Sequence, residues 1–269
     1  MRVRLAAIDL DGTLLRTDRT VSRRTRSALA AARDAGITIV VVTARSPRSA
    51  REIAADAGIG GIAICANGAT VYDLDHDRIV RHEPLPAALA ARIARGLRER
   101  VAGVTFGWEL ELRFGSEAAY EALRDSSTWP RPEGSFPPCD VLAWRRPMTK
   151  LLVRLPESDL DGVLAIAREL CGDEAAVTLA GHEFVEVMAA GVAKEAALAR
   201  LAAEQGIDAG EVVAFGDQLT DTGMLRWAGL GVAVANAREA ALEAADEVTA
   251  SNDEDGVALV LERLTAAAA

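Results

Sequence analysis

Apolar and polar residues alternate along the first third of the chain in blocks that suit strands and helices in turn. Short apolar runs rich in β-branched residues are typical of strands that a parallel sheet buries on both faces. Longer stretches with apolar residues three and four positions apart are typical of amphipathic helices. The predicted strands are 5–9, 37–43, 62–65 and, across the Asn67-Gly68 turn, 69–73, and the predicted helices are 22–35 and 47–57. This order predicts a parallel sheet with helices on both sides.

The middle of the chain has a different pattern. Pro84 and Pro86 precede a helical stretch, after which short strand-like segments alternate with helical ones, and the proline-rich stretch 129–138 predicts a loop. The predicted helices are 87–101, 117–125 and 158–171, and the predicted strands are 104–108, 110–114, 149–155, 176–179 and 184–188. We therefore predict an α+β module inserted into the parallel unit.

After Gly191 the pattern of the first third returns. The predicted helices are 194–204, 222–228, 238–244 and 256–264, and the predicted strands are 212–215 and 231–234, with an apolar pair at Val248. The predicted fold class is α/β, with a Rossmann-like parallel-sheet core and an inserted α+β domain. Residues 1–84 and 189–269 are expected to form the core, and residues 85–188 the insertion.

Composition limits the class of protein. With 269 residues, 50% of them apolar, the chain is long enough for two domains. It has no apolar run of about 18 residues and no leader-like start, so neither a membrane span nor secretion is expected. Its three cysteines fit neither a disulfide framework nor a zinc site, which favours a cytoplasmic location. The net charge of −10 argues against nucleic-acid and membrane partners, and no obligate protein partner is evident.

Two carboxylates leave the first predicted strand one residue apart. Asp9 and Asp11 follow the apolar run 3–8, and Gly12 and Thr13 come next. Because paired acids repel each other and resist desolvation, we expect a positive group between them. Mg²⁺ suits this position, since carboxylates and substrate phosphate together are its usual ligands. A β-turn followed by a helix cap would explain Asp11 and Gly12 but not Asp9.

Other polar residues are expected at the same edge of the sheet, because ligands of open parallel sheets bind beyond the carboxyl ends of the strands. The predicted strands end at Asp9 with Asp11, at Thr43, at Asn67, and at Gly216-Asp217 with Asp221. Lys194, which starts a predicted helix, can reach this edge. It is one of only two Lys in a chain with 28 Arg, which suits a need for a compact ammonium, although chance can also explain it. Taken singly, Thr43 and Asn67 are equally explained as cap and turn residues.

Carboxylates, a lysine and a hydroxyl at one site suit phosphoryl transfer, because a metal ion and an ammonium neutralise the phosphoryl oxygens while a carboxylate attacks. The chain has neither a GxxxxGK[ST] loop nor a GxGxxG after a strand, which argues against a P-loop NTPase and against a dinucleotide-binding protein. Its histidines, His76, His82 and His182, have no Ser or Cys arranged with them as a triad and are interpreted as surface or structural residues.

In order along the chain, the motifs Asp9-Leu10-Asp11-Gly12-Thr13, Thr43, Lys194 and 216–221 resemble those of the haloacid dehalogenase-like superfamily. The chain is most similar to the Cof-type phosphatase branch, whose α/β cap is inserted between the second and third motifs. The resemblance covers essentially the whole chain and includes 66–69, 185–187, 236–237 and 251–257. It implies that residues 85–188 form the cap, which selects the phosphate ester.

The resemblance also implies roles for individual residues. Asp9 would be the nucleophile, and Asp11 the acid and base that serves the leaving oxygen and then water. Thr43 and Lys194 would hold phosphoryl oxygens, with Gly12, Ala44, Arg45 and Asn67 as further phosphate-binding positions. Mg²⁺ would be held by Asp9, Asp11 through its main-chain carbonyl, and Asp217, with Asp221 as a more distant or water-mediated ligand. Dehalogenases of the superfamily lack the second acid, so Asp11 favours phosphoryl transfer.

Two positions depart from the Cof pattern, and the cap adds further candidates. Thr220 stands where Asn usually precedes the last acid, and Glu195 where Gly commonly follows the lysine. Candidate cap groups for the leaving group are Arg113, Arg145, Arg146, Lys150, Trp108 and Trp144, for each of which solvated or packing roles are the simpler interpretation. The sequence predicts a Mg²⁺-dependent phosphatase of small phosphorylated metabolites, such as sugar phosphates. A phosphohexomutase-like phosphotransferase and a non-catalytic phosphometabolite-binding protein are the alternatives.

Overall fold

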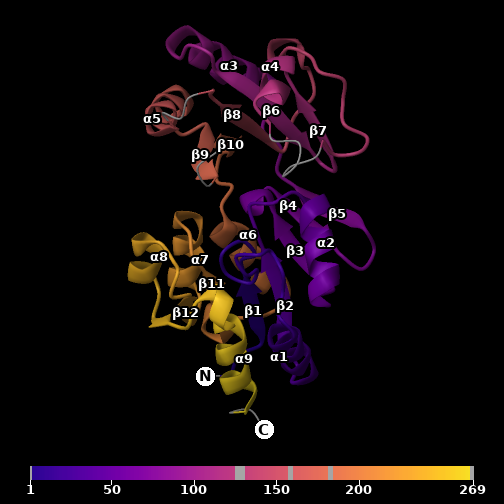
Figure 1. Cartoon of the computed structure of the whole chain (residues 1–269), viewed down its shortest axis with the longest axis vertical. Helices are drawn as coiled ribbons and strands as arrows, with labels where there is room; N and C mark the ends of the chain where they lie inside the picture. Colours follow the sequence, from indigo (N-terminus) through magenta and orange to yellow (C-terminus); the bar gives the residue numbers. More distant parts are fainter. Residues whose placement is uncertain (1, 125–130, 157–159, 181–183, 267–269) are drawn as a thin grey trace. The chain divides into compact units, whose positions relative to one another are not determined.

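The computed structural model describes residues 2–124, 131–156, 160–180 and 184–266 (Figure 1). The chain divides into two compact units, one formed by Met1–Val80 with Ala193–Ala269 and the other by Arg81–Val192. The second unit extends a few residues beyond both ends of the predicted insertion, 85–188. It is continuous in sequence, whereas the first unit is assembled from the two ends of the chain.

The first unit is built on an eight-stranded sheet in the order β13-β12-β11-β1-β2-β3-β4-β5. From β13 to β3 every pair of neighbours is parallel, whereas β3 and β4 are antiparallel. The strands are β1 (Leu5–Ile8), β2 (Thr38–Val42), β3 (Ile62–Cys65), β4 (Thr70–Asp73), β5 (Arg78–His82), β11 (Val212–Gly216), β12 (Leu230–Ala233) and β13 (Glu247–Val248). This arrangement confirms the predicted parallel-sheet core.

Six α-helices of the first unit are described, and local signals set several of their ends. They are α1 (Arg23–Asp34), α2 (Pro47–Ala57), α6 (Lys194–Glu204), α7 (Thr222–Trp227), α8 (Glu239–Ala244) and α9 (Gly256–Ala266). Ser22 caps α1, since its side chain accepts a hydrogen bond from the Thr25 N–H at 2.9 Å. Pro47 begins α2, and Gly58 ends it in the left-handed conformation, with φ of 70°.

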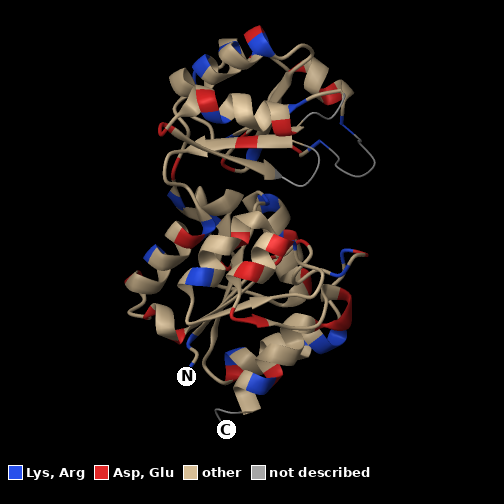
Figure 2. Ribbon diagram, turned by 90° about the vertical axis from the view of Figure 1, so that its left-hand side faces the viewer, with Lys and Arg blue, Asp and Glu red and all other residues tan. Residues whose placement is uncertain are grey.

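The helices cover both faces of this sheet. Helices α6, α7 and α8 share a buried core with side chains of the central strands, among them Leu5, Val40 and Val212. On the other face α1 contacts β2 and α2 contacts β3, while α1 and α9 lie side by side (Figure 1). Charged residues of both signs are interspersed along the helices (Figure 2). The central strands β1, β2, β3 and β11 carry no charged residue. A sheet buried on both faces therefore holds the strand ends in fixed positions.

The second unit is an antiparallel sheet with helices, which confirms the predicted α+β character. The strand order is β7-β6-β8-β10-β9. The elements are α3 (Ala87–Arg100), β6 (Thr105–Leu110), β7 (Arg113–Ser116), α4 (Ala118–Ala122), β8 (Lys150–Arg154), α5 (Leu160–Cys171), β9 (Ala175–Ala180) and β10 (Phe184–Ala189). Helices α3 and α5 pack together over a core that includes Phe106 and Trp108.

Several predicted boundaries were wrong. The predicted strands 104–108 and 110–114 are shifted towards the C-terminus, because the hairpin turns at Glu111, whose φ is 54°. The predicted helix 117–125 contains only the short helix α4, and residues 125 and 158, at the ends of two predicted helices, lie outside the described residues. Strand β5 was missed, because its Arg and His residues interrupt the apolar pattern of an edge strand.

Candidate active site

Four neighbouring strands bring the predicted polar residues to one edge of the sheet. Asp9 follows β1, Thr43 follows β2, the Asn67 turn follows β3, and Asp217 follows β11. Since β11, β1, β2 and β3 are consecutive and parallel, their carboxyl ends meet at the same edge. All four of these residues are buried, with at most 4% of their surface exposed.

Lys194 joins two buried carboxylates at this edge. Its Nζ lies 2.6 Å from Oδ1 of Asp9 and 2.6 Å from Oδ1 of Asp221. Burial opposes the charge on the ammonium, but Asp221 and Asp9 outweigh burial and raise the pKa of Lys194 above its ordinary value. For Asp9 burial prevails, and its pKa lies well above the ordinary range although Lys194 opposes the shift. The three side chains therefore form one buried ionic cluster whose charges depend on each other.

Asp217 is held from two sides. The hydroxyl of Thr13 donates to Oδ1 at 2.7 Å, and the amide of Gln218 donates to Oδ2 at 2.6 Å. Burial raises the pKa of Asp217. Gly12 makes room for this carboxylate, because its φ is +77° and a Cβ at this position would lie 2.6 Å from Oδ2 of Asp217. A glycine is therefore required at position 12 by both conformation and space.

Asp221 braces the loop that carries Asp217. Its Oδ2 accepts hydrogen bonds from the main-chain N–H of Asp217 at 3.0 Å and of Gln218 at 2.9 Å, while Oδ1 is held by Lys194. Both oxygens of Asp221 are thus engaged by protein donors. The carboxylate orients the loop and the lysine.

The acids of the site form an all-oxygen donor set. One carboxylate oxygen from each of Asp9, Asp217 and Asp221 lies within 4.8 Å of the others, and all three residues are buried. Hard divalent cations such as Mg²⁺ prefer oxygen ligands, so the chemistry of this set fits such an ion. Asp221 accepts from the Lys194 ammonium and two main-chain N–H groups, whereas Asp217 accepts only from two neutral side chains, so Asp9 and Asp217 are the better placed to contact the ion.

Asp9 and Asp11 each pair with a side-chain cation. Asp9 pairs with Lys194, and Asp11 pairs with Arg45, whose Nε and Nη2 each donate to a carboxylate oxygen of Asp11 at 2.6 Å. Arg45, predicted to bind phosphate, thus contacts the second acid of the first motif. Ala44 lies in the same bend, between Thr43 and Arg45.

The turn after β3 packs closely against the start of α6. Asn67 lies in the short 3₁₀ helix η1 (Ala66–Gly68) with φ of 54°, and its N–H donates to the main-chain oxygen of Thr43 at 3.0 Å. A Cβ on Gly68 would lie 2.4 Å from the main-chain oxygen of Ala193, the residue before Lys194. This glycine therefore lets the turn pack against the helix that presents Lys194.

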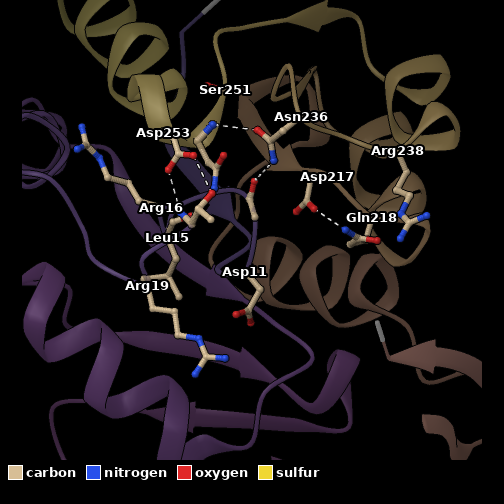
Figure 3. Close-up of a pocket in the computed structure, with 13 residues that line it drawn as sticks. Asp11, Leu15, Arg16, Arg19, Asp217, Gln218, Asn236, Arg238, Ser251 and Asp253 are labelled. Carbon is tan, nitrogen blue, oxygen red and sulfur yellow. Dashed lines mark hydrogen bonds between the residues drawn. The ribbon is translucent and has the colours of Figure 1, made fainter. Parts of the chain in front are cut away.

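A pocket of about 500 Å³ opens beside the acids (Figure 3). It is lined by residues of the loops that follow β1, β11, β12 and β13, namely Asp11, Gly12, Leu15, Arg16, Thr17, Arg19, Asp217, Gln218, Asn236, Arg238, Ser251, Asn252 and Asp253. The sequence marks Asn236 only as part of a motif, whereas in the structure its amide donates to the main-chain oxygen of Gly12 at 2.7 Å. It therefore supports the turn that follows Asp11.

One of the two departures from the Cof pattern has a structural explanation. The side chain of Glu195 lies against α7, since a Cβ on Gly223 would meet its Oε2 at 2.6 Å. The absence of a side chain at position 223 thus accommodates the larger residue at position 195. Thr220 lies half-buried in the 3₁₀ helix η4 (Leu219–Asp221), and nothing in the structure explains why it replaces Asn.

Four of the candidate groups make contacts within the second unit. Trp108 is fully buried, and its ring lies 5.1 Å from that of Trp144. Lys150 is 4% exposed and pairs with the buried Glu186 on a strand of the same sheet. The packing interpretation is thus confirmed for Trp108. Arg113 lies 3.6 Å above the ring of Phe136.

Comparison with known proteins identifies the family. Residues 6–261 match the model of haloacid dehalogenase-like hydrolases. The chain belongs to this family. It is 30% identical to the 5-amino-6-(5-phospho-D-ribitylamino)uracil phosphatase of Bacillus subtilis, over 95% of this chain and 93% of that protein. It is 28% identical to the pyridoxal phosphate phosphatase of Escherichia coli, over 96% of this chain and 97% of that protein.

Solved structures of this hydrolase family share the fold. A haloacid dehalogenase-like hydrolase from Bacillus subtilis superimposes with a TM-score of 0.81 at 28% identity, over 97% of this chain and 100% of that one. Within the described residues, every helix is too short or too polar to serve as a membrane-spanning segment.

Proposed function

We propose that this hydrolase is a Mg²⁺-dependent phosphatase that releases inorganic phosphate from small phosphorylated metabolites. The observation that carries the proposal is the buried cluster of Asp9, Lys194, Asp217 and Asp221 at the carboxyl end of the sheet, next to Asp11. The family supports hydrolysis, and relatives named as phosphatases of a phosphoribitylaminouracil and of pyridoxal phosphate support the metabolite class.

Each side chain has a role in this proposal. An oxygen of Asp9 attacks phosphorus and forms the aspartyl-phosphate, and the bond to the leaving oxygen breaks as Asp11 gives that oxygen a proton. Water then attacks phosphorus and passes a proton to Asp11, which releases phosphate and restores Asp9. Lys194 keeps Asp9 in position and neutralises phosphoryl charge. The hydroxyl of Thr43 donates to a phosphoryl oxygen.

Asp9 and Asp217 would hold the metal, together with the main-chain carbonyl of Asp11, while Asp221 acts from a distance by fixing Lys194 and the Asp217 loop. When bound, Mg²⁺ would neutralise negative charge on the phosphoryl group. The second unit is proposed to be the cap that selects the ester, with residues 1–84 and 189–269 as the catalytic core. The cytoplasmic location stays a prediction from the sequence.

The decisive experiment measures phosphate release from p-nitrophenyl phosphate and from a panel of phosphorylated metabolites that includes sugar phosphates. We expect turnover with Mg²⁺, none with EDTA, and none for Asp9→Asn. Asp56→Asn is the matched control, because Asp56 is an exposed residue paired with Arg26 in α1. A folded protein that releases no phosphate from any ester would refute the proposal. An isomeric phosphate ester formed without free phosphate would point to a mutase instead.

A further inference from the structure

A guanidinium holds the carboxylate of Asp11 by both oxygens. Arg45 donates from Nε to Oδ2 and from Nη2 to Oδ1, each at 2.6 Å, and its third nitrogen, Nη1, donates to Oγ of Ser49 at 2.7 Å. A two-pronged pair of this kind fixes orientation as well as distance. Asp11 is therefore held in one orientation even though 53% of its side chain is exposed.

Arg45, which makes this bidentate pair, is itself held in place by hydrogen bonds. The side chain of Arg45 is only 13% exposed, and its main-chain N–H donates to Oγ1 of Thr43 at 3.1 Å. Its main-chain oxygen accepts from the N–H of Ala66 at 2.8 Å. Among the described residues, Arg45 alone donates hydrogen bonds to the Asp11 carboxylate. The orientation of Asp11 thus depends on the loops that follow β2 and β3.

We propose that Arg45 is a positioning residue for Asp11 and acts on turnover rather than on phosphate affinity. The inference rests on the proposed function, in which Asp11 gives a proton to the leaving oxygen and takes one from water. A carboxylate oxygen that accepts one N–H keeps a second lone pair. The bidentate pair with Arg45 therefore prevents rotation of the Asp11 carboxylate but still allows it to exchange a proton. Proton transfer needs hydrogen-bond reach, and a displacement of about 1 Å can slow a reaction about 100-fold.

Arg45→Lys keeps the charge and removes the two-pronged geometry. The matched control is Arg24→Lys, because Arg24 makes the same kind of pair with Glu262, at 2.8 and 2.6 Å, on an exposed surface of α1 and α9. We expect Arg45→Lys to lower kcat about 10- to 100-fold, with KM and inhibition by inorganic phosphate changed less than about twofold. Arg24→Lys should leave kcat, KM and inhibition by inorganic phosphate unchanged.

The leaving group supplies a second readout. Nitrophenolate departs without a proton, whereas an alkoxide needs one. The loss of kcat in Arg45→Lys should therefore be greater for glycerol 3-phosphate than for p-nitrophenyl phosphate. In an Asp11→Asn background, Arg45→Lys should cause no further loss, because the group that it positions is gone.

Ser49→Ala removes the hydrogen bond from Nη1 of Arg45 to Ser49 and leaves the ion pair between Arg45 and Asp11. It should therefore lower kcat about two- to fivefold at constant KM. It also serves as the test if Arg45→Lys does not fold, as judged by its thermal melt. A rise in KM together with weaker phosphate inhibition, at unchanged kcat, would overturn the proposal and make Arg45 a phosphate ligand. The proposal would also be overturned if Arg45→Lys lowered kcat as much in the Asp11→Asn background as in the wild type. If the wild type hydrolyses no ester, the proposed function fails and takes this inference with it.

Discussion

Replacing Lys194 by Met tests whether the buried ionic cluster is held together by its ammonium. Methionine has a similar length and no charge, so the change removes the cation with little change in packing volume. It leaves Asp9, 4% exposed, and Asp221, 0% exposed, with oxygens within 4.8 Å of each other and without the ammonium that joins them. Their repulsion and desolvation then act against folding.

The expected loss follows from this burial. Removing one partner of a buried ion pair costs about 3–5 kcal/mol, because a buried charge is left uncompensated. At about 2–4 °C per kcal/mol for a unit of this size, the melting temperature should fall by about 6–20 °C. The measurement is thermal unfolding followed by circular dichroism in EDTA, together with urea unfolding to obtain the free energy.

A second substitution separates charge from packing. In Lys194→Met with Asp221→Asn, one of the two carboxylates is neutral, so part of the lost stability should return even though more polar contacts have been changed. A Lys194→Met protein within about 1 kcal/mol of the wild type would refute the reasoning, because that cost is typical of an exposed ion pair. So would a double variant less stable than the single one.

Three further changes test other parts of the structure. Ser22→Ala should lower the free energy of unfolding by about 1 kcal/mol, whereas Ser46→Ala, at a helix start where the side chain makes no capping hydrogen bond, should cost less, as urea unfolding would show. Gly12→Ala should weaken Mg²⁺ binding measured by calorimetry, because its Cβ would lie 2.6 Å from the Asp217 carboxylate, and unchanged affinity would contradict this. Burial holds the pKa of His82 below 6.5, so the unfolded chain takes up the proton first and stability falls as pH drops through and below that value. The difference in melting temperature between about pH 7.5 and 5.5 should therefore shrink in His82→Gln, and an equal difference would count against the assignment.

The sequence by itself determined the class of the fold and the order of its elements apart from β5. Helices α2 and α6 begin and end where the pattern predicts, because proline, glycine and apolar spacing act locally. The strand ends also identified where Asp9, Thr43 and Asp217 would meet, since a parallel sheet aligns its carboxyl ends. These conclusions needed no knowledge of side-chain geometry.

The tertiary structure decided which side chains touch. The sequence predicted a cation near Asp9 and Asp11, and folding adds a lysine from α6 beside the first and an arginine from the bend after β2 beside the second. Arg45 and Asp11 lie 34 positions apart, and Lys194 and Asp9 lie 185 apart. A pattern that repeats every two or four residues carries no information on such pairs, because they depend on how loops from different strands converge.

The same reason explains the errors in the second unit. Cross-strand packing decides whether the hairpin turns at residue 109 or at Glu111. A change in the position of the turn shifts every residue of both strands. Likewise, the pairing of Lys150 with Glu186 requires the register of β8 and β10, which only the assembled sheet sets. Local preference thus determined the elements, and long-range packing determined their contacts.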